Sequence, residues 1–143
     1  MSALSNPAQN TVETITDAGQ LLALLIRAGY APEQTVFLTP AQLNLQVGFV
    51  VYPAGGQVAP HTHHPLHRHI VGTTEVLIVR KGRCRVDIFS RPKCLAGSWE
   101  LGEGDIVLLA SGGHAVQMYE ETVLLEVKQG PYIGTAEKER FEE

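Results

Sequence analysis

Five of the six histidines in this chain lie within nine consecutive residues, and histidine is the commonest metal-ligating side chain. They are His61, His63, His64, His67 and His69. The pairs His61/His63 and His67/His69 both have His-x-His spacing, and in an extended segment residues i and i+2 point to the same side. Either pair can therefore present two imidazoles to one ion, and imidazole suits zinc, iron, nickel, copper and manganese.

Two residues outside this cluster are candidates for completing a metal site. Glu75 begins the next expected strand and offers a carboxylate, and His114 offers a fourth ligand from another strand. The alternatives are a Glu75 carboxylate paired with a nearby arginine and a hydrogen-bonded His114 in a Gly-rich turn. The histidine segment has two alternatives of its own: a surface loop that picks up metal only opportunistically, and a set of hydrogen-bonded polar side chains that holds no ion.

Three other charged side chains are candidate pocket groups. The planar fork of Arg68 suits a substrate carboxylate or phosphate, although a surface arginine or a partner of Glu75 has the same signature. Glu126 and Lys128 share one face of the last expected strand. That face is either a pocket wall or a solvated edge, and an inward placement of Leu125 and Val127 favours the solvated edge.

The composition indicates a globular protein without affinity for nucleic acid. Eleven basic against fifteen acidic side chains give a formal net charge of −4, so nothing attracts a phosphate backbone. Residues 1–14 have neither the basic nor the apolar part of a signal peptide. The longest strongly apolar run, Leu21–Ile26, is far shorter than the roughly 20 residues of a membrane span. We therefore expect a cytoplasmic protein with no membrane partner.

One helix is expected ahead of a series of strands. Apolar residues at helical spacing between an N-cap candidate at Thr16 or Asp17 and a terminating Gly29 predict a helix over 17–28. Alternation over 43–51 and then short apolar runs between Gly/Pro turns predict strands. These runs are 76–79, 83–88, 98–101, 106–109, 116–119 and 123–127. Many short strands predict an antiparallel sandwich or barrel and exclude a doubly wound α/β fold.

The two cysteines are expected to be free thiols. Cys84 and Cys94 flank a hairpin whose turn lies near Arg91-Pro92, and pairing across that turn sets Cys84 opposite Trp99 or Glu100. The sulfurs then do not meet, because a disulfide needs Cα atoms within about 7 Å.

The spacing of glycines and candidate ligands resembles the first motif of the cupin superfamily. That motif is Gly, five residues, His-x-His, a short gap, Glu, six residues and Gly, and Gly55, His61-x-His63, Glu75 and Gly82 are similar to it. The gap of eleven residues before Glu75 is longer than the three or four of the family pattern. The gap between the second pair, His67/His69, and Glu75 is five residues, so this pair remains the alternative.

The second cupin motif is also recognisable. Gly104, five residues, Ala110-x-Gly112 and His114 are similar to Gly, five residues, Pro-x-Gly, two residues and His, with alanine where proline is usual and a gap one residue shorter. Together with Arg68 and the segment 126–132, the likeness extends over about residues 35–141 to a group of small single-domain bacterial cupins of uncharacterised activity. Some of that group accompany surface-polysaccharide genes.

The resemblance implies an all-β, double-stranded β-helix (cupin or jelly-roll) barrel. It places the barrel over residues 35–134, after an N-terminal segment over 1–34 with the helix and before a charged tail over 135–143. It implies that His61, His63, Glu75 and His114, or the alternative pair His67 and His69, hold a divalent ion (Fe, Mn, Ni or Zn) inside the barrel. Such a site leaves one or two coordination positions open. A homodimer is also expected, with the apolar helix covering a sheet edge or a partner.

Fold alone does not choose a reaction. The expected function is a metal-dependent enzyme, an isomerase or oxygenase, that acts on a small polar metabolite of carbohydrate-like or carboxylate/keto type, with Arg68 binding the substrate. The alternatives are a metal-free isomerase or epimerase of sugar nucleotides, in which a histidine moves protons directly, and a non-catalytic small-molecule sensor.

Overall fold

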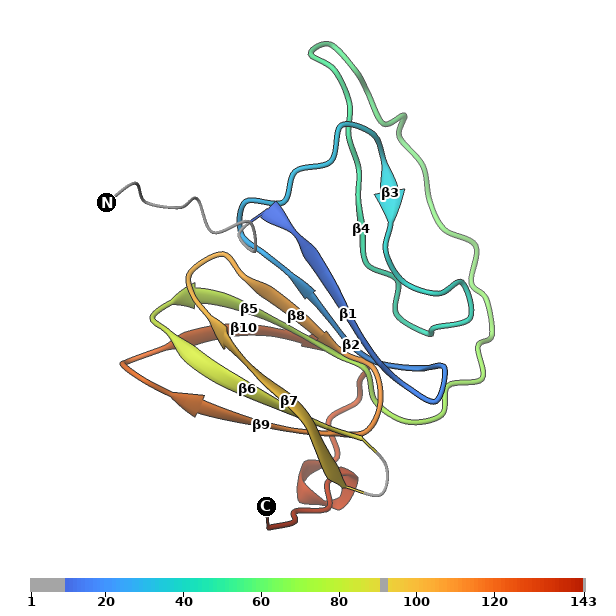
Figure 1. Ribbon diagram of the computed structural model, residues 1–143. Coiled ribbons are helices and arrows are strands. Elements are labelled where there is room, and N and C mark those ends of the chain that lie inside the picture. The colour runs from blue at the N-terminus through green and yellow to red at the C-terminus, as the bar shows by residue number, and fades with distance from the viewer. Residues whose placement is uncertain (1–9, 91–92, 143) are drawn as a thin grey trace, which may run out of the picture. The chain divides into compact units, whose positions relative to one another are not determined.

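The computed structural model describes residues 10–90 and 93–142 of the 143-residue chain. The chain forms two compact units, which we describe separately. Unit 1 consists of Met1–Tyr30 and Thr73–Glu143, and unit 2 consists of Ala31–Gly72 (Figure 1). The N-terminal stretch 1–9 and the turn expected near Arg91-Pro92 lie outside the described residues.

The described residues of unit 1 form eight strands, which pair only in antiparallel fashion. They are β1 (Val12–Asp17), β2 (Gln20–Ile26), β5 (Glu75–Lys81), β6 (Cys84–Ser90), β7 (Cys94–Leu101), β8 (Ile106–Leu109), β9 (Gly113–Met118) and β10 (Val123–Lys128). A short 3-10 helix, η2 (Gly134–Glu137), follows β10. Among the described residues there is no α-helix, so the all-β prediction is confirmed and the predicted N-terminal helix is wrong.

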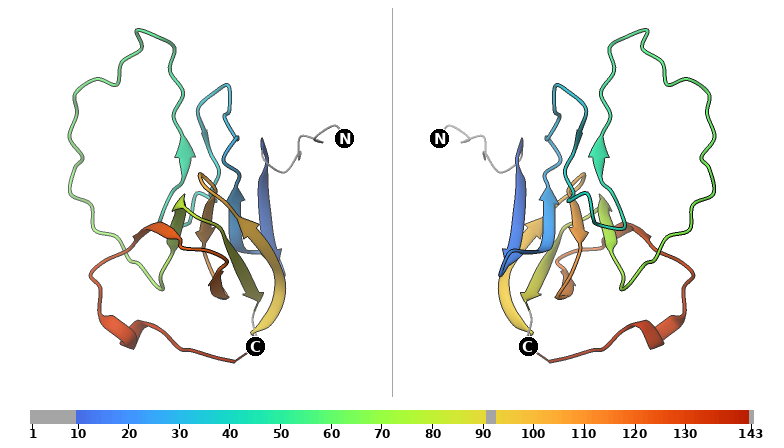
Figure 2. Two further views of the ribbon diagram at one scale, coloured as in Figure 1. Left: turned by 90° about the vertical axis from the view of Figure 1, so that its left-hand side faces the viewer. Right: turned by 90° about the vertical axis from the view of Figure 1, so that its right-hand side faces the viewer.

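The strands of unit 1 form two sheets that face each other across an apolar core (Figure 2). One sheet has the order β1-β2-β8-β5-β10 and the other the order β7-β6-β9. The core consists of Ile15, Leu22, Ala23, Leu25, Leu77, Val79, Cys84, Val86, Ile88, Leu101, Val107 and Leu109, with Trp99, Val116 and Leu124 packed against it. Because side chains alternate between the two faces of a strand, residues two positions away from a core residue on the same strand also face the interior.

The helix expected over residues 17–28 is absent, and residues 12–26 form a β-hairpin instead. Ala18 and Gly19 have φ values of 48° and 78°, and two positive φ angles in a two-residue loop match the right-handed twist of the flanking strands. β2 lies between β1 and β8, and Leu22–Ile26 are all buried. A short apolar run that is buried throughout has no period of its own, so helix and strand look alike there. The homodimer prediction therefore loses the helix on which it rested.

The strand predictions from residue 76 onward are confirmed within a few residues. β8 has the predicted bounds, and the Gly102–Asp105 turn forms, with the Asp105 backbone N–H donating to the Gly102 carbonyl at 3.0 Å. Cys84 pairs with Leu101, two residues or fewer from the expected partners, and Cys94 pairs with Ser90. Both thiols are free, as predicted, with Cys84 buried and Cys94 exposed.

Unit 2 has one short antiparallel pair, β3 (Val36–Phe37) and β4 (Gly48–Phe49). The strand predicted over 43–51 is reduced to β4, because the preceding residues form a loop closed by Gln46. The Gln46 amide donates to the carbonyls of Pro40 at 2.9 Å and Leu43 at 2.7 Å, and its oxygen accepts the Thr39 hydroxyl at 2.8 Å. These hydrogen bonds lie within the loop and take the place of the bonds to a neighbouring strand that a β-strand would make.

The structure also bears on the membrane prediction. Among the described residues, no helix has the length and apolar character that crossing a bilayer requires.

Candidate functional site

A polar group at one end of the unit 1 core follows from strand alternation. Glu75 shares the inner face of β5 with Leu77 and Val79, and His114 shares the inner face of β9 with Val116. The two strands belong to opposite sheets. His114 Nε2 lies 3.1 Å from Glu75 Oε2, so this pair bridges the sandwich.

The same alternation brings Lys128 to the pair. Leu124 packs on the core, which turns Glu126 and Lys128 inward and leaves Leu125 and Val127 46% and 45% exposed. The placement of this face as a solvated edge is therefore wrong for Lys128, whose side chain is 18% exposed. Lys128 is directly opposite Glu75 in the β5–β10 register, and its Nζ lies 4.0 Å from Glu75 Oε1.

The C-terminal tail supplies a second carboxylate to Lys128. Glu137 Oε1 accepts a hydrogen bond from Lys128 Nζ at 3.0 Å, and the Tyr132 ring centroid lies 4.8 Å from the same ammonium. Glu126 Oε1 lies 3.7 Å away. The hydrogen bond to Glu137 is the largest cause that raises the pKa of Lys128, with smaller contributions from Glu126 and Glu75, against the opposing effect of desolvation.

Electrostatics keep Glu75 ionised despite its burial. The hydrogen bond from His114 is the main cause that lowers the pKa of Glu75, and the charge of Lys128 adds to it, whereas desolvation alone would raise the pKa. The Glu75 side chain is 12% exposed and the His114 side chain is 36% exposed. The carboxylate therefore lies inside, and the imidazole is partly exposed.

Two glycines hold His114 in place. Gly112 has a φ of 73°, and a Cβ there would collide with the backbone carbonyl of Phe89. A Cβ at Gly113 would collide with the ring of Phe141, which packs edge-on against the Phe89 ring at 5.0 Å between centroids. The Gly-Gly-His sequence thus places His114 beside both β6 and the C-terminal tail.

A buried amide beside the pair has an unused donor. Gln129 Oε1 accepts the backbone N–H of Thr74, the residue before Glu75, at 2.7 Å. Its Nε2 is buried and has no hydrogen-bond partner within the described part of the chain. A buried donor without a partner is costly, so a ligand that supplies an acceptor there would gain affinity.

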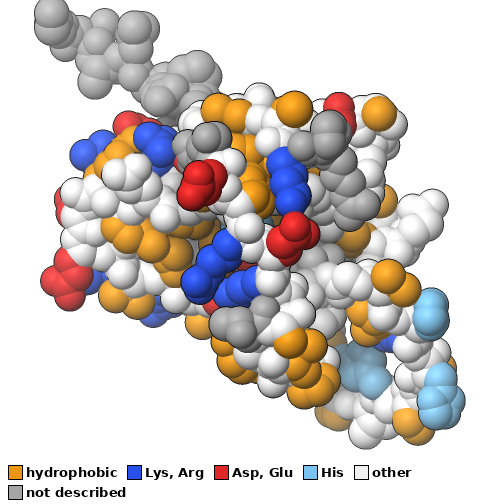
Figure 3. Space-filling model, turned by 90° about the horizontal axis from the view of Figure 1, so that it is seen from below, with side chains coloured by type: hydrophobic (Ala, Val, Ile, Leu, Met, Phe, Trp, Pro, Cys, Tyr) orange, Lys and Arg blue, Asp and Glu red, His pale blue; other side chains and the backbone are white. Residues whose placement is uncertain are grey.

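The histidine cluster lies in unit 2, in the stretch between β4 and β5, and all five imidazoles are exposed. Histidine side chains stand at the surface in Figure 3. The rings of His61 and His63 are neighbours, with centroids 5.2 Å apart and planes at 67°. His61 Nδ1 lies 2.8 Å from the Ala59 carbonyl oxygen, so this nitrogen carries the proton and Nε2 keeps its lone pair.

The four predicted metal ligands form two pairs, one in each unit. Glu75 and His114 meet in unit 1, and His61 and His63 meet in unit 2. Among residues 10–90 and 93–142, no group of three or more His, Cys, Asp or Glu side chains is placed to hold a metal ion. Of the alternative pair, His69 lines a cavity of unit 2 together with Arg68.

Comparison of the chain with protein-family models, with curated proteins and with solved structures found no match in any of the three.

Two residues of the site, Glu137 and Gln129, could not be predicted from the sequence. Glu137 lies in a run of charged residues that resembles a solvated tail, yet it contacts Lys128 with only 13% of its side chain exposed. Gln129 is a single amide after a strand. Lys128 lies opposite Glu75 on the neighbouring strand β10, a pairing of distant segments that cannot be predicted without knowing the sheet order and the inner face of β10.

Proposed function

We propose that unit 1 binds a small polar metabolite where the His114 side chain is exposed and moves a proton with the Glu75–His114 pair. One observation carries the proposal: a buried, ionised carboxylate contacts a partly exposed imidazole across the two sheets at 3.1 Å. A carboxylate that holds one ring nitrogen of a histidine leaves the other nitrogen for acid–base chemistry. This corresponds to the metal-free alternative among the functions expected from the sequence.

The route of the proton follows from the contact between Glu75 and His114. Glu75 accepts the N–H of His114 Nε2, which fixes the tautomer with a lone pair on Nδ1. Nδ1 then takes a proton from a C–H beside a carbonyl of the ligand, the electron pair of that bond passes into the carbonyl as an enolate, and an imidazolium forms beside the Glu75 carboxylate. When the neighbouring carbon carries a hydroxyl group, a proton shift between the two oxygens of the ligand and return of the proton from Nδ1 to that carbon give an isomer, without any oxidant.

Backbone geometry supports the cupin-like, double-stranded β-helix reading of the fold. All four glycines that carry the likeness to the cupin motifs have positive φ: Gly55 82°, Gly82 92°, Gly104 87° and Gly112 73°. Residues with a Cβ seldom adopt such angles, so these positions require glycine for the turns they make. The facing antiparallel sheets of unit 1 are compatible with a jelly-roll arrangement.

A metal centre is the second candidate function, and the tautomer of His61 favours it. Metal-binding histidines usually donate their other ring N–H to a carbonyl or carboxylate, as His61 does to Ala59. In this version the His61/His63 pair of unit 2 would hold the ion, which would supply Lewis-acid polarisation of a carbonyl. The ammonium of Lys128 beside Glu75 opposes a cation at the unit 1 pair.

Exchange of carbon-bound hydrogen with solvent tests the acid–base proposal directly. The wild-type chain is incubated in D₂O with fructose, fructose 6-phosphate, pyruvate and oxaloacetate, and deuterium next to each carbonyl is followed by NMR. At least one probe should exchange faster than without protein, and H114Q should lose about 100-fold or more of that rate.

The matched control is H64Q, which removes an exposed histidine of unit 2 and should exchange like the wild type. Thermal unfolding of both variants separates loss of chemistry from loss of fold. If no probe exchanges above background, or if H114Q exchanges like the wild type while folded, the acid–base role of His114 is wrong.

A further inference from the structure

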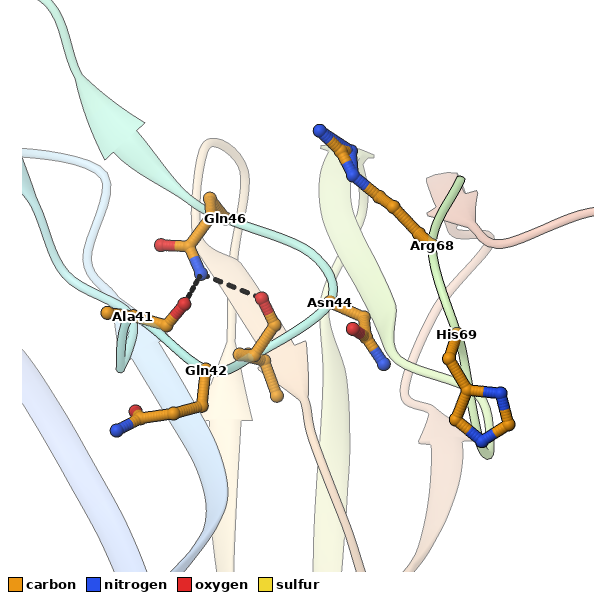
Figure 4. A pocket seen from close by; sticks show the side chains of 7 residues that line it. Ala41, Gln42, Asn44, Gln46, Arg68 and His69 are labelled. Carbon is orange, nitrogen blue, oxygen red and sulfur yellow. Dashed lines mark hydrogen bonds between the residues drawn. The ribbon is translucent and has the colours of Figure 1, made fainter. Parts of the chain in front are cut away.

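Unit 2 contains an open cavity of about 420 Å³ that the proposed function does not use. Its residues come from two places in the chain. Gln42 and Asn44 belong to the loop that precedes β4, and Arg68 and His69 belong to the stretch after the His61/His63 pair. Figure 4 shows the two groups on opposite sides of the cavity.

The loop side of the cavity is held in a fixed shape by Gln46. The Gln46 amide nitrogen donates to carbonyls of the loop, and Figure 4 draws its bonds to Ala41 and Leu43. Its oxygen accepts from the Thr39 hydroxyl, and Thr39, which is buried, in turn accepts the Val47 backbone N–H at 3.2 Å. A wall fixed before binding costs little ordering entropy when a ligand arrives.

Apart from Gln46, the polar side chains that line the cavity are not used by the protein itself. Within the described ranges, Gln42, Asn44, Arg68 and His69 make no side-chain hydrogen bond and no ion pair. The cavity is lined by one arginine and no acidic residue. Glu33 is the single Asp or Glu of the sequence between residues 31 and 72. Nothing in the sequence near the cavity competes with a ligand anion for Arg68.

From this we infer that unit 2 has a binding site of its own for a small, hydroxylated metabolite that carries one oxyanion. Arg68 binds the phosphate or carboxylate through its planar fork. The amides of Gln42 and Asn44 both donate and accept, which suits neighbouring hydroxyl groups. A volume of about 420 Å³ has room for a molecule of the size of a sugar phosphate or sugar acid.

Isothermal titration calorimetry with four probes tests the site: glucose 1-phosphate, glucuronate, inorganic phosphate and glucose. Glucose 1-phosphate or glucuronate should bind, and their relative affinities decide between phosphate and carboxylate. Glucose, which lacks the oxyanion, and inorganic phosphate, which lacks the hydroxyls, should each bind at least about tenfold more weakly. R68Q should weaken binding by about tenfold or more, and N44A by a smaller factor.

Two control variants keep the outcome interpretable. R80Q removes the same charge from an exposed residue of β5 and should bind like the wild type. H114Q alters the proposed acid–base site of unit 1 and should also bind like the wild type. Equal losses in R68Q and R80Q would contradict the site, as would inorganic phosphate binding as tightly as glucose 1-phosphate. So would the absence of binding up to about 10 mM of every probe. Loss in H114Q with R68Q unaffected would assign the ligand to unit 1, leaving the proposed function standing and this site disproved.

Discussion

His114 Nε2 lies 3.1 Å from Glu75 Oε2, and the two residues come from opposite sheets of the unit 1 sandwich. The contact therefore depends on how the sheets pack, and it reports on that packing. Because the carboxylate is more buried than the imidazole, their protonation affects stability and chemistry in different ways.

Acid should weaken the fold through Glu75. Its pKa is lowered in the folded state, mainly by the hydrogen bond from His114, so its contribution is present above the ordinary value of 4.5 and is lost as pH falls through the lower folded value. E75Q should cost about 1–3 kcal/mol at neutral pH, because it weakens a buried hydrogen bond to an ionised group. Urea unfolding of both proteins between neutral pH and about pH 3 measures this, and the E75Q curve should be flatter below 4.5. Parallel curves would show that Glu75 does not carry the acid sensitivity.

Lys128 should contribute to the stability of the fold up to alkaline pH. Its pKa is raised, mainly by the hydrogen bond to Glu137, so its contribution is present below 10.5 and is lost as pH rises through the higher folded value. K128M leaves Glu75, Glu126 and Glu137 without their shared cation. Since the charge of Lys128 helps to lower the pKa of Glu75, the acid unfolding midpoint of K128M should move to higher pH. K81M, at an exposed residue of the same strand pair, is the matched control and should leave the midpoint unchanged.

Glycine at position 112 should be essential for the placement of His114. G112A puts a Cβ at a φ of 73° against the Phe89 carbonyl, which should cost about 2–4 kcal/mol of unfolding free energy. G102A is the control, because Gly102 has no positive φ and nothing lies within 4 Å of its added Cβ. Denaturant unfolding of the two variants compares them. Equal stabilities would mean that the turn tolerates a side chain.

The sequence predicted the later strands well because their boundaries are set by local chemistry. The turn at Gly102–Asp105 and the breaks at Gly82 and Gly112 all require positive φ or a side-chain bond within the turn, and such signals are readable from residue types. The same signals placed Glu75 and His114 on separate strands. Their meeting across the core was expected only from the family resemblance.

Where the sequence failed, tertiary context decided the structure. The run from Leu22 to Ile26 became a central strand because β8 pairs with it, a partner more than 80 residues away. The residues before β4 did not form a strand because Gln46 bonds to three carbonyls of its own loop. The inner face of β10 was misjudged because Leu124, and not Leu125, packs on the core. None of these choices is encoded in a local period.

The choice between the two histidine pairs is testable by metal content. The Nδ1 proton of His61 is used on Ala59, so its Nε2 is free to bind, and the His63 ring is its neighbour at 5.2 Å. His69 instead lines the unit 2 cavity with Arg68. The untagged chain, exposed to Fe(II), Mn(II), Ni(II) and Zn(II) and then dialysed, should retain about one divalent ion if the metal centre exists. H61A/H63A should lose that ion and H67A/H69A should keep it, as measured by elemental analysis.

Retention in H61A/H63A with loss in H67A/H69A would reverse the assignment of the pair. A wild-type chain that retains no ion would reject the metal centre, leaving the acid–base proposal for Glu75 and His114 to be judged by solvent exchange.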